Sequence, residues 1–405
     1  MNQTAVDEAI AYATTHGRIS IQIFRHNCRI ATGPLDLLTD EIPNNVFSVT
    51  KSVISMIAGI AYDRNLLALD DPIGKFLPNE PGWGDAAHRA LTIRELLTET
   101  SGLNEAILSE TATVATDASI PQEALGEPFK YPPGTKFEYS QRVPDLMSFV
   151  VQQAVGEDIQ TFAQKNLFDP IGIPSDSFFW LRDRSGDTYG YAFLFMPPTQ
   201  LAKLGLLMQN GGSWNGQQLI SWDWASAVSQ PTTTNPCYGY YFWTNEGMPC
   251  TGANIPSAQT YDRHLIPSAP DDLFAMVGAF QQNNFMIPSL GITVTWSGVL
   301  GDTEPNLSAI LSASPGADLY YNFFRILMRG VEDVHIPDPG PWQDDPLDLD
   351  VNPLNYISPA VLLNDLVSSP ECNIIFCNNE IPTVGEIENL QEIADVGLGF
   401  LGNTI

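Results

Sequence analysis

The chain has 405 residues, of which 44% are hydrophobic and 10% aromatic, so it has enough apolar side chains for a buried core, and disorder of the whole chain is excluded. Its 47 acidic and 18 basic residues give a formal net charge of −29, which disfavours nucleic acid and anionic membranes as partners because their phosphates would be repelled. No run of residues approaches the roughly 20 apolar positions of a membrane-spanning helix. The first eight residues also lack the basic start and the apolar run of a signal peptide.

The order of apolar and polar residues predicts strands near both ends of the chain and helices between them. Residues 1–16 are expected to form a helix, and the alternation of Ile19, Ile21 and Ile23 predicts a half-buried strand that pairs with residues 28–32. Further helices are expected at 48–64, 92–99, 144–155, 198–210 and 317–328. Strand-like runs return at 273–278, 284–287 and 291–297. This order predicts an α/β fold of the α+β type, in which one sheet layer is interrupted by a helical insertion.

The predicted main domain covers residues 1–330. Its sheet is expected from residues 17–47 and 265–300, and its helical insertion from about residues 65–260. Residues 331–405 differ in composition, with fourteen acidic residues and no Lys or Arg. Prolines predict an extended course at the start of this segment, while its apolar residues are too many for free disorder. We expect an acidic C-terminal extension that packs on the main domain.

The five cysteines predict two local disulfides. Cys237 with Cys250 and Cys372 with Cys377 each bracket a short segment that contains turn residues, which leaves Cys28 free. Disulfides persist in oxidising compartments, so we expect an extracellular or periplasmic protein. Five cysteines are also an ordinary number for a cytoplasmic chain of this length, and a cytoplasmic location is the alternative.

A Ser and a Lys stand three residues apart at the start of the predicted helix 48–64. This spacing puts Ser48 and Lys51 on one helix face, with roughly 5–6 Å between their Cβ atoms. A hydroxyl becomes a good nucleophile when a base takes its proton, and Lys51 could be that base if its pKa falls. The helix dipole and burial among apolar neighbours both push this pKa down. The Ser48 N–H would stabilise an oxyanion. The alternative is an amphipathic helix whose Lys51 reaches solvent.

Two later segments supply further candidate groups. Tyr139 follows a Pro-Pro-Gly turn, and its phenol could carry a proton between Ser48 and a leaving group, or it could simply pack. Gly278 lies within the strand-like run 274–282, where a glycine permits the close approach of a ligand. The N–H of Ala279 could then pair with that of Ser48 as an oxyanion hole. The alternative at Gly278 is a bulge or a sheet corner.

These three segments, in this order, resemble the motifs of the serine β-lactamase and penicillin-binding-protein superfamily. They are most similar to its class C-like branch of carboxylesterases, transesterases, D-aminopeptidases and nylon-oligomer hydrolases. The resemblance runs from about Ile19 to Arg329 and includes family-like connecting segments at 66–73, 91–103, 166–173 and 210–216. It implies a β-lactamase/transpeptidase-like fold with an antiparallel sheet flanked by helices. It also implies Ser48 as nucleophile, Lys51 as base, Tyr139 as second proton carrier, and no metal or cofactor.

The chain departs from the family motifs at positions that bear on the substrate. Gln141 stands where the family has Asn, and Met276 stands where the family has the Lys that holds a β-lactam carboxylate. On this alignment the substrate contacts are Gln141, Trp243, Gly278 and Phe280. We expect a serine hydrolase that cleaves a small-molecule carboxylic ester or amide through an acyl-Ser48 intermediate. A catalytically inactive binding protein and a true β-lactamase are the alternatives, and the sequence carries no signal for an oligomeric state.

Overall fold

The computed structural model describes residues 1–113, 117–253, 259–298, 318–343, 352 and 356–367. The chain divides into two compact units. Unit 1 comprises Met1–Glu41, Val46–Ser52 and Met196–Asp350, and unit 2 comprises Ile42–Asn45, Val53–Phe195 and Val351–Ile405. The main stretch of unit 2 ends at Phe195, and unit 1 resumes at Met196.

The helices and strands follow the predicted order closely. The helices are α1 (Gln3–Thr15), α2 (Asp36–Thr39), α3 (Val49–Asp63), α4 (Ala86–Arg89), α5 (Ile93–Leu97), α6 (Ile107–Glu110), α7 (Ile120–Gly126), α8 (Arg142–Val155), α9 (Ile159–Ala163), α10 (Pro198–Gln209), α11 (Trp222–Ala227), α13 (Asp318–Met328) and α14 (Pro359–Val367). The strands are β1 (Arg18–Arg25), β2 (Cys28–Thr32), β3 (Asn44–Asn45), β4 (Phe179–Trp180), β5 (Leu194–Met196), β6 (Ser213–Trp214), β7 (Gln217–Gln218), β8 (Trp243–Thr244), β9 (Cys250–Thr251), β10 (Thr260–Tyr261), β11 (Phe274–Gly278), β12 (Gln282–Ile287) and β13 (Ile292–Gly298).

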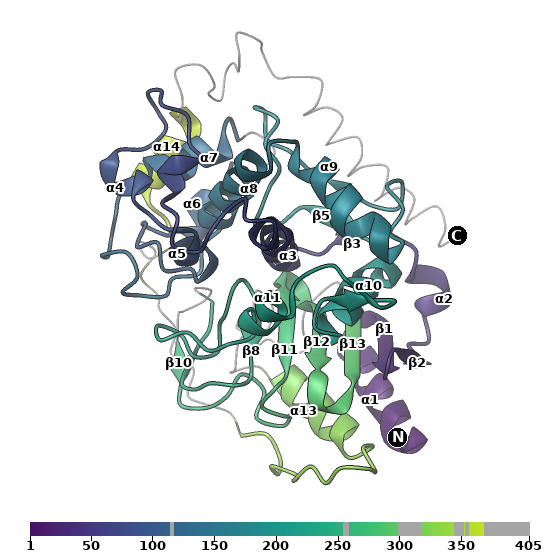
Figure 1. The fold of residues 1–405 in the computed structure, drawn as a ribbon. Helices are drawn as coiled ribbons and strands as arrows, with labels where there is room; N and C mark the ends of the chain where they lie inside the picture. The colour runs from purple at the N-terminus through teal and green to yellow at the C-terminus, as the bar shows by residue number, and fades with distance from the viewer. Residues whose placement is uncertain (114–116, 254–258, 299–317, 344–351, 353–355, 368–405) are drawn as a thin grey trace. The chain divides into compact units, whose positions relative to one another are not determined.

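Unit 1 is built on a six-stranded sheet in the order β2-β1-β13-β12-β11-β8, with antiparallel neighbours (Figure 1). Successive side chains of a strand point to opposite faces of a sheet. On one face Phe285 of β12 meets Tyr320 and Phe324 of α13, with ring centroids 5.1 and 5.0 Å away. On the other face Asn284 donates to the Leu201 carbonyl of α10 at 2.8 Å. The sheet therefore lies between α13 and α10, and the expected mixture of helices with an antiparallel sheet is confirmed.

Strand β1 differs from the half-buried strand that its alternating isoleucines predicted. Ile21 and Ile23 are fully buried, but so are Ser20 and Gln22 on the opposite face. Helices α1 and α2 both pack against this strand. The buried Ser20 hydroxyl on the polar face is satisfied because it donates to the Asp40 carboxylate at 2.9 Å.

The segment 274–282 is not one continuous strand. Strand β11 ends at Gly278, Ala279–Gln281 form a 3-10 turn, and β12 begins at Gln282. Phe280 and Gln281 within this turn have φ values of 56° and 61°. A left-handed backbone of this kind leaves no mark in hydrophobic periodicity, so the pattern could not reveal the turn.

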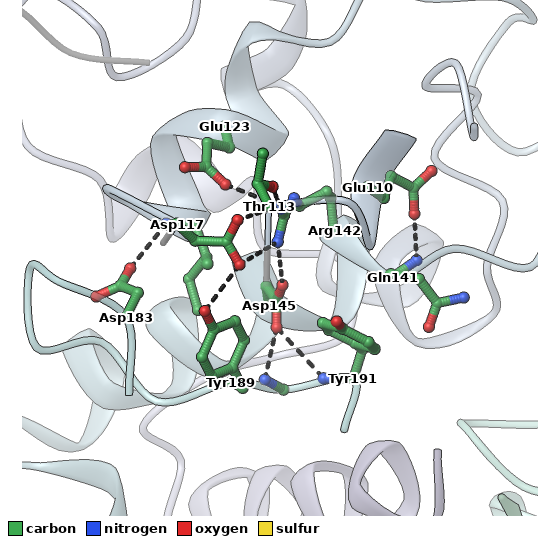
Figure 2. Close-up of polar contacts among 12 residues, drawn as sticks. Glu110, Thr113, Asp117, Glu123, Gln141, Arg142, Asp145, Asp183, Tyr189 and Tyr191 are labelled. Atoms are coloured by element: carbon green, nitrogen blue, oxygen red, sulfur yellow. Dashed lines mark hydrogen bonds and ion pairs between the residues drawn. The ribbon is translucent and has the colours of Figure 1, made fainter. Parts of the chain in front are cut away.

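Unit 2 contains a fully buried ion-pair network around Arg142 (Figure 2). Its guanidinium lies 2.8 Å from Asp117, 3.0 Å from Glu123 and 3.2 Å from Asp145. One cation faces three carboxylates here, and burial raises the pKa of Asp145 to about 7. Asp145 also accepts the N–H of Gly190 at 2.7 Å, so the network ties the start of α8 to distant loops.

Of the C-terminal extension, the structure describes residues 331–343, 352 and 356–367. Helix α14 packs against α6 and α7 of unit 2, where Asn364 hydrogen-bonds the Glu123 carbonyl.

In unit 1, Cys237 and Cys250 form a disulfide and Cys28 is a free, exposed thiol. The expected pair Cys372 and Cys377 lies outside the described residues.

A second carboxylate group in unit 2 gives a prediction about pH. Burial, and then the charges of Glu110, Glu127 and Glu99, raise the pKa of Glu105 well above its ordinary value. The folded chain therefore holds this proton to a higher pH than the unfolded chain does, and the free energy of unfolding falls as pH rises above the ordinary carboxyl range. Glu105→Gln removes that loss, so its stability relative to wild type should grow, by up to about 1.4 kcal/mol per pH unit, as the pH rises above the ordinary carboxyl range.

Thermal unfolding at several pH values measures this difference, with Glu80→Gln at an exposed position as the control. A constant offset at every pH would contradict the raised pKa. A stability difference that shrinks as the pH rises would contradict it as well.

Candidate active site

Ser48 lies directly before helix α3, and Lys51 lies in the first turn of that helix. The Lys51 Nζ donates to the Ser48 Oγ at 3.3 Å. Lys51 is only 1% exposed, among the fully buried Val49, Val53 and Ile54. The predicted pair is therefore brought together, with the Lys51 side chain almost wholly withdrawn from solvent.

The segment before Ser48 is in close contact with the end of β11. A Cβ atom at Gly278 would lie 2.2 Å from the Val46 carbonyl oxygen and 3.2 Å from the Phe47 Cβ. The rings of Phe47 and Phe280 also pack together, with centroids 5.2 Å apart. The structure thus places the Gly278–Phe280 turn, with the Ala279 N–H, against the chain that leads into Ser48.

Tyr139 and Gln141 belong to unit 2, in the segment just before α8. Tyr139 is 5% exposed and Gln141 is 3% exposed. The Gln141 N–H donates to Glu110 at 2.8 Å (Figure 2), and the Ser140 hydroxyl accepts the Val143 N–H at 2.9 Å. Helix α8 therefore starts at Arg142, two residues earlier than the expected start at residue 144, because Ser140 caps its first turn.

Two other positions named from the sequence lie in the sheet of unit 1. Trp243 is paired with Ala275 across β8 and β11, and its ring packs edge-on against Tyr238. Met276 is fully buried, and its sulfur accepts a hydrogen bond from Asn284 at 3.8 Å. The position that carries the Lys of the family motif therefore holds a neutral core side chain.

Sequence reasoning missed Arg18 and Tyr320, which contact the turn after β11. Arg18 donates to the carbonyls of Phe280 and Gln281, and the Tyr320 hydroxyl hydrogen-bonds the side chain of Gln281. The one signal for Arg18 was a basic residue that opens an apolar strand. Its partners are 262 and 263 residues away in the chain, a separation that no local pattern reports.

Among the described residues, one group of acidic side chains could hold a metal ion. One oxygen from each of Glu105, Glu110 and Glu127 lies within 4.8 Å of the others, and all three are buried. Carboxylate oxygens suit Ca²⁺ and Mg²⁺. The two oxygens of Glu110, however, already accept the N–H groups of Ala106 and Gln141, and burial with its acidic neighbours raises the pKa of Glu105.

Across the part of the chain that the structure describes, no helix combines the length and apolar character needed to cross a membrane.

Comparisons with known proteins agree with the fold. Esterase EstB from Burkholderia gladioli is 27% identical over 141 residues, which are 31% of this chain and 36% of that protein. Lovastatin esterase from Penicillium rubens is 28% identical over 154 residues, which are 33% of this chain and 38% of that protein. The matched region thus spans little more than a third of the length of these relatives.

A solved penicillin-binding protein homologue from Caulobacter crescentus superposes with a TM-score of 0.57 over 81% of this chain and 97% of that chain. At 14% identity this likeness shows the fold alone, and it confirms the predicted β-lactamase/transpeptidase-like architecture. The beta-lactamase family profile matches residues 43–297, more than half of the chain and including Ser48, Lys51 and Gly278. The chain belongs to the beta-lactamase family.

Proposed function

We propose that this protein is a serine hydrolase that cleaves carboxylic esters or amides through an acyl-Ser48 intermediate. The observation that carries the proposal is the 3.3 Å contact between the buried Lys51 amine and the Ser48 hydroxyl at the start of α3. A nucleophile and a base within hydrogen-bond reach are the first requirement of covalent catalysis. The family membership and the two relatives named as esterases support the same class of reaction.

In this mechanism Lys51 takes the hydroxyl proton as the Ser48 Oγ attacks the substrate carbonyl carbon. The carbonyl oxygen becomes an oxyanion, which the N–H groups of Ser48 and Ala279 stabilise. The C–O or C–N bond then breaks, and the leaving group receives a proton through Tyr139. Water attacks the acyl-Ser48 ester by the same route, which releases the acid and restores the hydroxyl.

The substrate is proposed to be neutral at the acyl side. Met276 offers no charge where a family Lys would hold a carboxylate, and it is fully buried. The formal net charge of −29 further disfavours anionic substrates by long-range repulsion. A neutral ester or amide fits both features better than a β-lactam, which carries a carboxylate.

We also propose that the protein works in an oxidising compartment, outside the cytoplasm. The bridge between Cys237 and Cys250 supports this, since structural disulfides persist mainly in such compartments.

The first prediction tests the nucleophile and its base. Ser48→Ala should abolish hydrolysis of p-nitrophenyl acetate, and Lys51→Ala should lower kcat by several orders of magnitude because the hydroxyl keeps its proton. A fluorophosphonate probe should modify Ser48 in the wild type, as located by peptide mass spectrometry. Lys75→Ala, which removes an exposed ion pair with Asp71, should keep full activity. Normal turnover by a folded Ser48→Ala protein would refute the proposed function.

The second prediction concerns proton transfer by Tyr139. Tyr139→Phe should lower kcat by about 10²- to 10⁴-fold, because positioned acid–base groups contribute that much. Its melting temperature should change little. The control is Tyr261→Phe, which also removes a hydroxyl from a nearly buried tyrosine of unit 1 and should leave kcat unchanged. An unchanged kcat in Tyr139→Phe would mean that this residue only packs.

The third prediction concerns substrate class. Short p-nitrophenyl esters should be hydrolysed with a higher kcat/KM than a cephalosporin, because the cephalosporin carboxylate finds no cation from position 276, where the side chain is a buried methionine, and is repelled by the negative net charge. Steady-state kinetics with both substrates on one enzyme preparation measure this ratio. A ratio in favour of the cephalosporin would identify a true β-lactamase with the same Ser48 chemistry.

A further inference from the structure

Arg18 is a buried cation beside the turn that joins β11 to β12. It opens strand β1 and is 1% exposed. Its Nη1 donates to the Phe280 carbonyl at 3.0 Å and to the Gln281 carbonyl at 2.7 Å. Its guanidinium also lies over the ring of Trp296, 6.0 Å from the centroid. One guanidinium nitrogen therefore holds two consecutive main-chain carbonyls of the turn.

The turn is one that its own residues would not adopt readily. Phe280 and Gln281 have φ values of 56° and 61°, in the left-handed region that side chains other than Gly disfavour. Such conformations persist where the surroundings determine them, and they gather at functional sites. The Tyr320 hydroxyl bonds the Gln281 side chain, so Arg18 and Tyr320 together hold the second half of the turn.

The path of the Arg18 side chain depends on a glycine. A Cβ at Gly298 of β13 would lie 2.5 Å from the Arg18 Cζ, so a larger residue there would displace the guanidinium. Gln282 donates to the Gly298 carbonyl at 2.6 Å, which links the same point to the first residue of β12. The guanidinium therefore occupies a site shaped for it between β1, β13 and the turn.

The turn that Arg18 holds is the one that contacts the segment before Ser48. Gly278 packs against the Val46 carbonyl, and Phe280 packs against Phe47. Ala279 lies between these two contacts, one residue before the first carbonyl that Arg18 binds. The Phe280 carbonyl lies two peptides after the one that carries the Ala279 N–H, so a shift of the turn at Phe280 or Gln281 reaches the Ala279 peptide through the intervening backbone torsions.

We propose that Arg18, supported by Tyr320, is a positioning residue that aims the Ala279 N–H at the oxyanion formed during attack by Ser48. The inference rests on the proposed serine hydrolase function. A donor aimed at the oxyanion acts on the transition state more than on the bound substrate. Loss of its aim lowers kcat and leaves KM nearly unchanged, whereas general destabilisation lowers only the amount of folded enzyme.

The test compares Arg18→Lys with Arg89→Lys. Arg89 is the matched control, because its guanidinium also binds main-chain carbonyls but does so in unit 2, at Gly74, Leu77, Pro78 and Trp83. Rates are divided by the number of sites that a fluorophosphonate labels, so that unfolded protein does not count. Arg18→Lys should lower kcat about 10- to 100-fold, somewhat less than the loss of a whole oxyanion donor. Arg89→Lys should keep its kcat.

A boronic acid inhibitor supplies a readout that a merely structural role would not move. An aryl boronic acid forms a tetrahedral adduct with a serine hydroxyl and presents an oxygen where the oxyanion would lie. Its inhibition constant should rise in Arg18→Lys by the same factor as kcat falls, while KM for the ester stays within about twofold.

If Arg18→Lys does not fold, Tyr320→Phe tests the positioning proposal in its place. It removes one hydroxyl and keeps the ring that packs on Phe285 and Trp296. It should show the same pattern with a smaller, several-fold loss of kcat. The proposal is overturned if the folded Arg18 variant, or Tyr320→Phe in its place, keeps the wild-type kcat and boronate affinity while Ser48 remains the labelled residue. Labelling at another residue would overturn the proposed function as well.

Discussion

The site depends on how closely the end of β11 approaches the chain before Ser48. A side chain at position 278 would meet the Val46 carbonyl at 2.2 Å, a distance that no real Cβ contact shows, so only glycine permits the approach. Strand β11 is held in turn by its ladder with β12, where Gly278 pairs with Gln282. A rigid, doubly covered sheet therefore sets where the nucleophile lies, although Ser48 itself belongs to a helix start.

The close approach at Gly278 does not by itself determine the orientation of the Ala279 peptide. The buried guanidinium of Arg18 is important for this orientation. Burying a guanidinium is costly unless its donors are satisfied. Two turn carbonyls, at 3.0 and 2.7 Å, satisfy part of that need, and the same two bonds stabilise backbone angles that Phe280 and Gln281 would otherwise avoid. The same two hydrogen bonds thus compensate part of the cost of burying the guanidinium and part of the cost of the left-handed turn, so both features occur at one place.

Contacts of this site between residues that are close in the sequence could be predicted, whereas contacts between residues that are far apart in the sequence could not. Helical spacing placed Lys51 beside Ser48, and alternation located β1 and the strands near the C-terminal end. Periodicity could not show that 274–282 breaks into a left-handed turn, nor that β1 is covered on both faces. The Arg18 contacts join residues 262 and 263 positions apart, and such contacts follow from the sheet order rather than from any local pattern.

The buried acidic residues of unit 2 show that the net charge of the chain does not determine where its individual charged groups lie. A net charge of −29 predicts acidic side chains that are exposed to solvent, yet Glu105, Glu110 and Glu127 are buried together. Glu110 uses its two oxygens to hold the N–H groups of Ala106 and Gln141, two residues after Tyr139. Burial and the charges of its acidic neighbours raise the pKa of Glu105, so the charge of this cluster depends on pH, and Glu110 links the cluster to the segment that carries Tyr139. Stability toward pH and the geometry of the proposed proton carrier therefore share one group of carboxylates.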